Sequence, residues 1–166
     1  MQELASSPKN GWEVYRSPEH RKAMYELADA YMDFLTASKT ERETVSEVIA
    51  RLTEAGYAEG FATDKAWQAL HGKAIFVARK GRHPLSEGIR LISAHTDSPR
   101  LDLKQHPLIE QVGVGQAKTH YYGGLRKYQW FARPLALHGV IVKSDGRSAS
   151  ASVSSAGIFV RSVVTW

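Results

Sequence analysis

The chain has 166 residues, 43% of them hydrophobic and 10% aromatic, and carries a formal net charge of +5 at pH 7. This is enough for one domain with a buried core, or for one domain plus part of another. The sequence contains no cysteine, which excludes a disulfide scaffold, a cysteine nucleophile and a thiolate metal site. A bound metal would therefore need histidine and carboxylate ligands. Because disulfides are rare in the cytoplasm, the absence of cysteine also leads us to expect a cytoplasmic protein.

Targeting and charge patterns exclude further classes. The first ten residues lack the basic and apolar regions of a secretory signal. No apolar run approaches the ~18 residues of a membrane span, so we expect no membrane partner. The basic residues are dispersed apart from short groups such as residues 79–83, so we also expect no nucleic-acid partner.

Two amphipathic helices are predicted first. One begins at Ser17-Pro18, with Ser17 as N-cap and Pro18 as the first helical residue, and has apolar side chains at helical spacing up to Leu35. The other begins with the capping box Thr40–Glu43 and ends before Gly56, which can adopt a left-handed conformation. We interpret both apolar faces as core.

Strands follow the helices. Residues 74–78 predict a short strand, 80–88 a turn-rich loop, and the apolar residues 89–94 a second strand that ends at His95. Helices followed by such strands indicate an α/β fold, the start of a helix-covered mixed sheet.

The character changes after Lys104. Proline and glycine residues break any helical period, which predicts short, bent strands. Residues 135–142 predict a buried strand ending at the hairpin signal 144–146. Four histidines outside the candidate site are not expected to bind a metal. We expect His71 and His83 to be solvated in loops, and His120 and His138 to lie on strands with backbone partners.

The candidate site is His95-Thr96-Asp97, at the end of the predicted strand 89–94. Open α/β sheets place ligand sites at the carboxyl ends of their strands. Alternation along a strand points residues 95 and 97 to the same side. Neutral imidazole is a common metal ligand, and a carboxylate beside it can orient the ring. Alone, this pair is a weak signal, because a surface histidine beside a turn-capping aspartate is the commoner arrangement.

Longer segments make the pattern specific. Four of them together resemble the M18 metalloaminopeptidases, the aspartyl-aminopeptidase-like family of dinuclear zinc exopeptidases. They are residues 38–42 (SKTER), 93–104 (SAHTDSPRLDLK), 119–130 (THYYGGLRKYQW) and 133–141 (RPLALHGVI). The resemblance covers roughly the amino-terminal third of such an enzyme.

The resemblance implies fold, activity and site residues. His95 maps onto a zinc ligand and Asp97 onto the aspartate that supports catalysis, in a site that holds two Zn²⁺ ions in the complete enzyme. The implied function is zinc-dependent removal of amino-terminal residues from peptides by a metal-activated water, in a homo-oligomer. The implied domains are residues 1–104, the first part of a catalytic domain of the zinc-exopeptidase type, and residues 105–146, part of an inserted β-rich domain that serves oligomerisation.

Residues 147–166 form an unassigned tail. They contain no Asp, Glu or His, whereas the family continues to further zinc ligands and a general base. We interpret the tail as aberrant, through a changed reading frame or an artificial end; a Ser-rich terminus or an added strand are the alternatives. We therefore expect a truncated chain that is marginally stable, self-associates and is inactive alone.

Two other functions stay open. One is a non-catalytic fragment with an assembly role through residues 105–146. The other is a basic nucleic-acid-binding module that uses Arg126, Lys127, Tyr128 and Trp130. Zinc-dependent peptide cleavage separates the enzyme from the first, and salt-dependent oligonucleotide binding tests the second.

Overall fold

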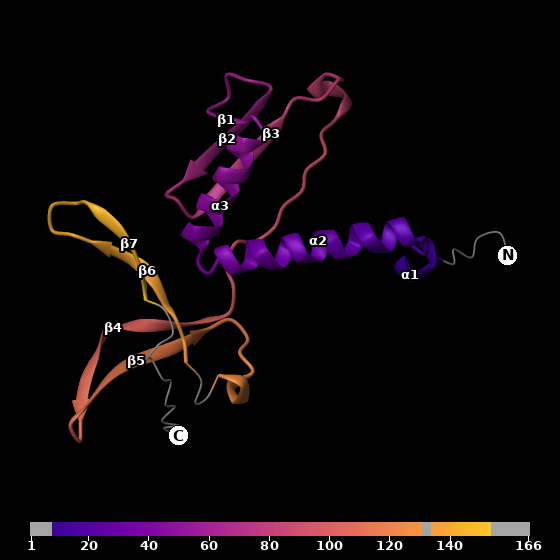
Figure 1. The fold of residues 1–166 in the computed structure, drawn as a ribbon. Coiled ribbons are helices and arrows are strands. Elements are labelled where there is room, and N and C mark those ends of the chain that lie inside the picture. Colours follow the sequence, from indigo (N-terminus) through magenta and orange to yellow (C-terminus); the bar gives the residue numbers. More distant parts are fainter. Residues whose placement is uncertain (1–7, 131–133, 154–166) are drawn as a thin grey trace, which may run out of the picture. The chain divides into compact units, whose positions relative to one another are not determined.

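The structure, a computed structural model, describes residues 8–130 and 134–153 (Figure 1). The chain divides into two compact units, residues 1–38 and 39–166. The first unit contains the helices α1 (Gly11–Val14) and α2 (Pro18–Ala37). The second contains the helix α3 (Glu41–Glu54) and two short 3-10 helices, η2 (Leu85–Glu87) and η3 (Lys127–Gln129). Its strands are β1 (Ala58–Glu59), β2 (Lys65–Leu70), β3 (Ala74–Arg79), β4 (Arg100–Gln111), β5 (Val114–Tyr122), β6 (Leu137–Val142) and β7 (Ser148–Val153).

Helix α2 begins as predicted. The Ser17 hydroxyl accepts a hydrogen bond from the His20 amide at 3.2 Å, and Pro18 occupies the first turn. The prediction that its apolar face is core is wrong for this structure, because α2 buries none of its residues and Leu27 is 72% exposed. An apolar stripe forms a core only where another element covers it. No helix in the described part of the chain is both long and apolar enough to cross a membrane.

Helix α3 confirms the predicted capping box. The Glu43 amide donates to the Thr40 hydroxyl at 3.3 Å, and the Glu43 carboxylate accepts from the Lys39 amide at 3.1 Å. Its inner face carries Val45, which is 2% exposed. The helix stops at Ala55, and Gly56 follows with a φ of +79°.

A small mixed sheet follows α3. β1 pairs with β2 in parallel, and β2 pairs with β3 antiparallel. The strand predicted at 74–78 is confirmed as β3, whereas β2 had not been predicted. His71 and Gly72, with φ of +52° and +64°, close the β2–β3 hairpin. Ala66 and Trp67 of β2 are buried, and α3 packs against β3.

The strand predicted at 89–94 is not formed. Residues 88–99 belong to neither a helix nor a strand. Ile89, Leu91 and Ile92 are 70%, 74% and 93% exposed. A strand is defined by hydrogen bonds to a neighbour, so an apolar, β-favouring sequence stays irregular where no neighbour pairs with it. The candidate residues His95 and Asp97 therefore lie in an extended loop.

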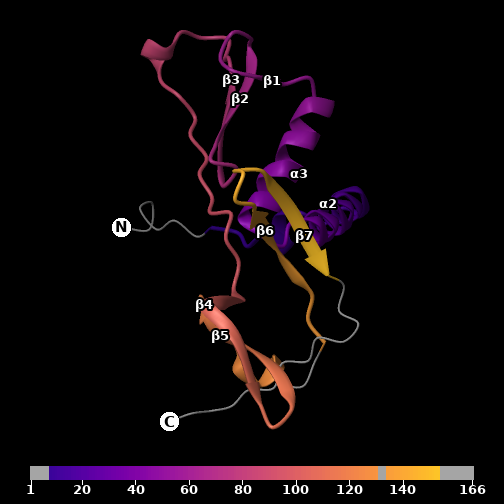
Figure 2. The ribbon, with the colours of Figure 1, turned by 90° about the vertical axis from the view of Figure 1, so that its left-hand side faces the viewer.

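Two hairpins complete the described chain (Figures 1 and 2). β4 and β5 form a long antiparallel ribbon whose register shifts between Leu103 and Leu108. β6 and β7 pair antiparallel from Leu137–Val153 to Val142–Ser148, which confirms the strand and hairpin predicted within 135–146. The predicted burial of this strand is wrong, because β6 contains no buried residue and Ile141 is 58% exposed. Helices with a small mixed sheet and antiparallel hairpins confirm the predicted α/β class.

Candidate functional site

His95 and Asp97 contact each other, although the strand that was predicted to point them to the same side is not formed. The His95 Nδ1 lies 2.8 Å from the Asp97 carbonyl oxygen and 3.1 Å from its carboxylate Oδ1. The His95 side chain is 81% exposed and that of Asp97 is 37% exposed. The imidazole is thus held on one side by Asp97 and open to solvent on the other.

This contact favours the tautomer of His95 that carries its proton on Nδ1. A backbone carbonyl can only accept a hydrogen bond, so Nδ1 at 2.8 Å from the Asp97 carbonyl is the donor. In the neutral ring, Nε2 then keeps its lone pair. A histidine that donates through one nitrogen to a carbonyl or carboxylate and presents the other is the usual state of a metal ligand.

Asp97 is in turn held by Tyr122, at the end of β5. The Tyr122 hydroxyl donates to the Asp97 Oδ2 at 3.0 Å. This bond, with a backbone hydrogen bond and the nearby His95, lowers the pKa of Asp97 below its usual value. The same bond raises the pKa of Tyr122. Both shifts favour an ionised Asp97 and a neutral Tyr122, so the phenol donates its hydrogen bond to a carboxylate.

Arg100, the first residue of β4, connects this pair to the rest of the unit. Its guanidinium carbon lies 4.4 Å from the centre of the Tyr122 ring. Nε donates to Asp102 at 2.7 Å and Nη1 donates to Glu41 at 2.9 Å. Partial burial alone would lower the pKa of Arg100, but the Asp102 and Glu41 carboxylates outweigh it and raise that pKa.

The first turn of α3 receives a second long-range contact. The His138 Nδ1 of β6 lies 2.8 Å from the Glu43 Oε1. Burial alone would raise the pKa of Glu43, but His138 and Thr40 together lower it. The expected backbone partner for His138 is therefore wrong, because a carboxylate 95 residues away in the sequence replaces it. For His120 it is confirmed, with the Tyr121 carbonyl 3.4 Å from Nδ1.

The four quoted sequence segments thus meet in one network. Glu41 comes from the first segment, Asp97 and Arg100 from the second, Tyr122 from the third and His138 from the fourth. Sequence reasoning selected only His95 and Asp97. Arg100 and Tyr122 lay inside the quoted segments, but no local pattern in the sequence distinguished them from their neighbours.

The residues available for a metal ion are few. Within residues 8–130 and 134–153, no group of three or more His, Asp or Glu side chains could hold a metal ion. A catalytic zinc site uses three protein ligands. The His95–Asp97 pair fits one imidazole ligand with its orienting carboxylate, and the described residues do not fit a complete zinc site.

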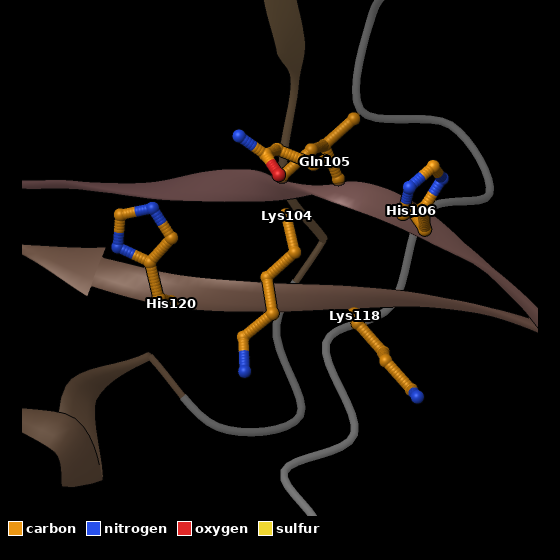
Figure 3. A pocket seen from close by; sticks show the side chains of 6 residues that line it. Lys104, Gln105, His106, Lys118 and His120 are labelled. Carbon is orange, nitrogen blue, oxygen red and sulfur yellow. The ribbon is translucent and has the colours of Figure 1, made fainter.

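A separate basic hollow lies on the β4–β5 ribbon. It is shallow and largely open, has a volume of about 520 Å³, and is lined by Leu103, Lys104, Gln105, His106, Lys118 and His120 (Figure 3). The residues considered for a nucleic-acid module lie elsewhere. Lys127 is in η3 with its ammonium 5.0 Å from the centre of the Tyr121 ring. The basic residues of the hollow, on β4 and β5, are not contiguous in the sequence with Arg126 and Lys127 at η3.

Comparison with known proteins identifies the family of the chain. The family model described as aminopeptidase I zinc metalloprotease (M18) matches residues 34–158. The match runs past Gly146 and through β7, into residues 147–158 of the tail.

Individual relatives agree with the family match. The chain is 42% identical over 154 residues to a probable M18 family aminopeptidase 1 of Clostridium acetobutylicum, covering 87% of this chain and 33% of that protein. The crystal structure of aminopeptidase I from Borrelia burgdorferi matches with a TM-score of 0.76 at 30% identity, over 87% of this chain and 37% of that one. The M18 aminopeptidase structure from Thermotoga maritima matches with a TM-score of 0.75 at 40% identity, over 90% and 33%.

The chain spans about a third of the length of these relatives. The matched part includes all four segments that carry the His95 network. By sequence and by fold, the chain belongs to the M18 family of zinc metallo-aminopeptidases.

Proposed function

We propose that this chain supplies part of the active site of a zinc-dependent aminopeptidase, with His95 as one zinc ligand and Asp97 as the carboxylate that supports it. The observation that carries the proposal is the hydrogen bond from His95 Nδ1 to the Asp97 carbonyl, which leaves Nε2 able to bind a metal. In relatives about three times as long, the remaining ligands would come from the length that this chain does not match.

The proposal extends to substrate, assembly and domains. Family membership supports a peptidase, and we propose peptide substrates, two Zn²⁺ ions in the complete site, a homo-oligomer and a cytoplasmic location. We retain residues 1–104 as catalytic-domain sequence, residues 105–146 as β-rich sequence and residues 147–166 as a tail of unassigned role. The 88–95 segment, with its exposed Ile92, would be covered in the complete enzyme.

The metal ligand can be tested on the 166-residue chain. Calorimetry with Zn²⁺ should show weak binding that His95→Ala removes, because one ligand gives little affinity. His83→Ala is a matched control, since His83 is 78% exposed and its Nδ1 lies 3.1 Å from a Glu87 oxygen. Tight binding that survives His95→Ala would overturn the assignment of His95.

Activity and association test the rest of the proposal. With one proposed ligand we expect the chain alone to hydrolyse no aminoacyl-nitroanilide at any zinc concentration. We also expect it to self-associate in sedimentation experiments. Ile92→Lys should reduce that association, because a charge on an exposed apolar segment opposes strand pairing. Val112→Lys, at an equally exposed turn, should not. Zinc-dependent turnover lost in His95→Ala would show that a working site forms from these residues.

A further inference from the structure

We propose that Tyr122, held in place by Arg100, is a positioning residue that fixes the Asp97 carboxylate and, through it, the ring of His95. The relevance of this positioning to zinc rests on the proposed function. The positioning itself is a property of the metal-free chain and can be measured there.

First, the two oxygens of the Asp97 carboxylate have different partners. Oδ2 accepts from the Tyr122 hydroxyl at 3.0 Å, and Oδ1 faces the His95 Nδ1 at 3.1 Å. A carboxylate that is bonded through one oxygen has a restricted rotation, so its second oxygen stays directed at the imidazole. Tyr122 therefore acts on His95 without contacting it.

The second step is the loop that carries the pair. Residues 88–99 have no strand pairing to hold them in place. Side-chain hydrogen bonds therefore matter more here than in a strand. Tyr122 ties Asp97 to the end of β5, and the Thr96 hydroxyl donates to the Lys73 carbonyl, before β3, at 3.3 Å. These two bonds fix the residues on either side of the Thr96–Asp97 peptide bond.

The third step is the support of Tyr122 itself. Its side chain is not buried, because 39% of the residue is exposed. Arg100 is its direct partner in the β4–β5 register and covers its ring at 4.4 Å. Arg100 is fixed in turn by Asp102 and Glu41, with hydrogen bonds of 2.7 and 2.9 Å. The tyrosine is thus held by a guanidinium that is anchored at two carboxylates.

The consequence for His95 is a defined tautomer. A mobile Asp97 side chain would leave Nδ1 with the backbone carbonyl alone, in a loop that no strand restrains. With the carboxylate fixed, two acceptors face Nδ1 and favour the proton there. Nε2 is then unprotonated, in the form that a metal ion requires.

The test compares Tyr122→Phe with Tyr121→Phe in the full 166-residue chain. Long-range proton–nitrogen correlation spectra distinguish the two histidine tautomers. Tyr122→Phe should lower the ratio of the Nδ1–H to the Nε2–H form of His95 about three-fold or more, the effect of losing one ordinary hydrogen bond. Tyr121→Phe should leave it unchanged, since the Tyr121 ring packs under Lys127 instead. A folded Tyr122→Phe chain with an unchanged His95 tautomer would overturn the proposal.

A second variant covers the case in which Tyr122→Phe does not fold. Asp97 lies outside the helices and strands, so Asp97→Ala should leave the hairpins intact. It should shift the ring Cζ resonance of Tyr122 but not that of Tyr121, because only the Tyr122 hydroxyl donates to this carboxylate. An unmoved Tyr122 resonance would show that the bond to Asp97 is absent, and the proposal would fail.

A metal titration separates this proposal from the proposed function. Co²⁺ added to the wild-type chain should broaden the His95 ring signals before those of His83. If His95 ignores Co²⁺ but its tautomer still responds to Tyr122→Phe, the positioning stands and the zinc assignment fails. If His95 binds Co²⁺ and its tautomer does not respond, the positioning role fails and the zinc assignment stands.

Discussion

The first turn of α3 and the 88–95 segment lie in the same compact unit and use their side chains in opposite ways. At the first turn, polar residues are bonded within the turn and to distant strands, through Glu41 to Arg100 and through Glu43 to His138. In the 88–95 segment, apolar residues such as Ile92 face solvent. The difference shows that the burial or bonding of a side chain here depends on whether the described chain contains its partner, and not on how hydrophobic the residue is.

The largest expected effect contrasts a covered with an uncovered apolar side chain. Val45→Ala should lower the free energy of unfolding by about 2 kcal/mol, because it leaves a cavity at a residue that is 2% exposed. Ile92→Ala should change it by less than about 0.5 kcal/mol, since Ile92 is 93% exposed. Urea unfolding of both variants measures this. Equal losses would mean that the 88–95 segment is packed in solution and would break the comparison.

The next effect concerns Arg100. Arg100→Leu should cost about 1–2 kcal/mol of unfolding free energy, because it leaves Glu41 and Asp102 without their half-buried partner. Arg147→Leu is the control, since its pair with Asp145 is exposed and joins residues only two apart. Thermal melting of both variants measures this difference in stability. If Arg100→Leu left the free energy of unfolding unchanged, the Arg100 contacts with Glu41 and Asp102 would not stabilise the fold.

The pH dependence of stability sharpens the comparison at Glu43. The pKa of Glu43 is lowered from its usual value of 4.5, so the group stabilises the fold above that value. This stabilisation is lost as the pH falls below 4.5 through the folded-state pKa. Glu43→Gln should therefore flatten the acid limb of a stability–pH curve. Glu47→Gln is the control and should leave the acid limb largely unchanged, because Glu47 pairs only with Arg51 inside α3 and makes no long-range contact in the described residues. An unchanged acid limb in Glu43→Gln would contradict the assignment.

The smallest expected effect is at the β4–β5 turn. Val112 has a φ of +51°, which a β-branched residue rarely adopts, and Gly113 follows at +74°. Val112→Asn should stabilise the chain by about 0.5–1 kcal/mol, because Asn-Gly suits such a turn. Gly113→Ala should destabilise it by about 1 kcal/mol, because alanine is strained at this positive φ. Chemical denaturation gives both signs, and a destabilised Val112→Asn would show that the valine has another role.

Local signals in the sequence predicted local structure well. The capping box at Thr40, the Ser17 N-cap and the hairpin signal at 144–146 act within a few residues, and the structure confirms all three. The contact between His95 and Asp97 also joins residues only two apart, but it forms in a loop and not through the predicted strand alternation. The strand predicted at 89–94 does not form, because strand formation depends on a pairing neighbour that local patterns do not reveal. The Tyr122–Asp97 and His138–Glu43 contacts span 25 and 95 residues, which no spacing rule reaches.

Those long-range contacts also have a consequence for the order of folding. The capping box closes within four residues, whereas Arg100–Glu41 and His138–Glu43 close loops of 59 and 95 residues. Loop closure becomes entropically harder by about 0.6 kcal/mol for each doubling of length. We therefore expect α3 and its cap to form early and to present Glu41 and Glu43 as ready acceptors. β4 would dock on them before β6, so the surroundings of His95 would be among the later parts of the chain to reach their final form.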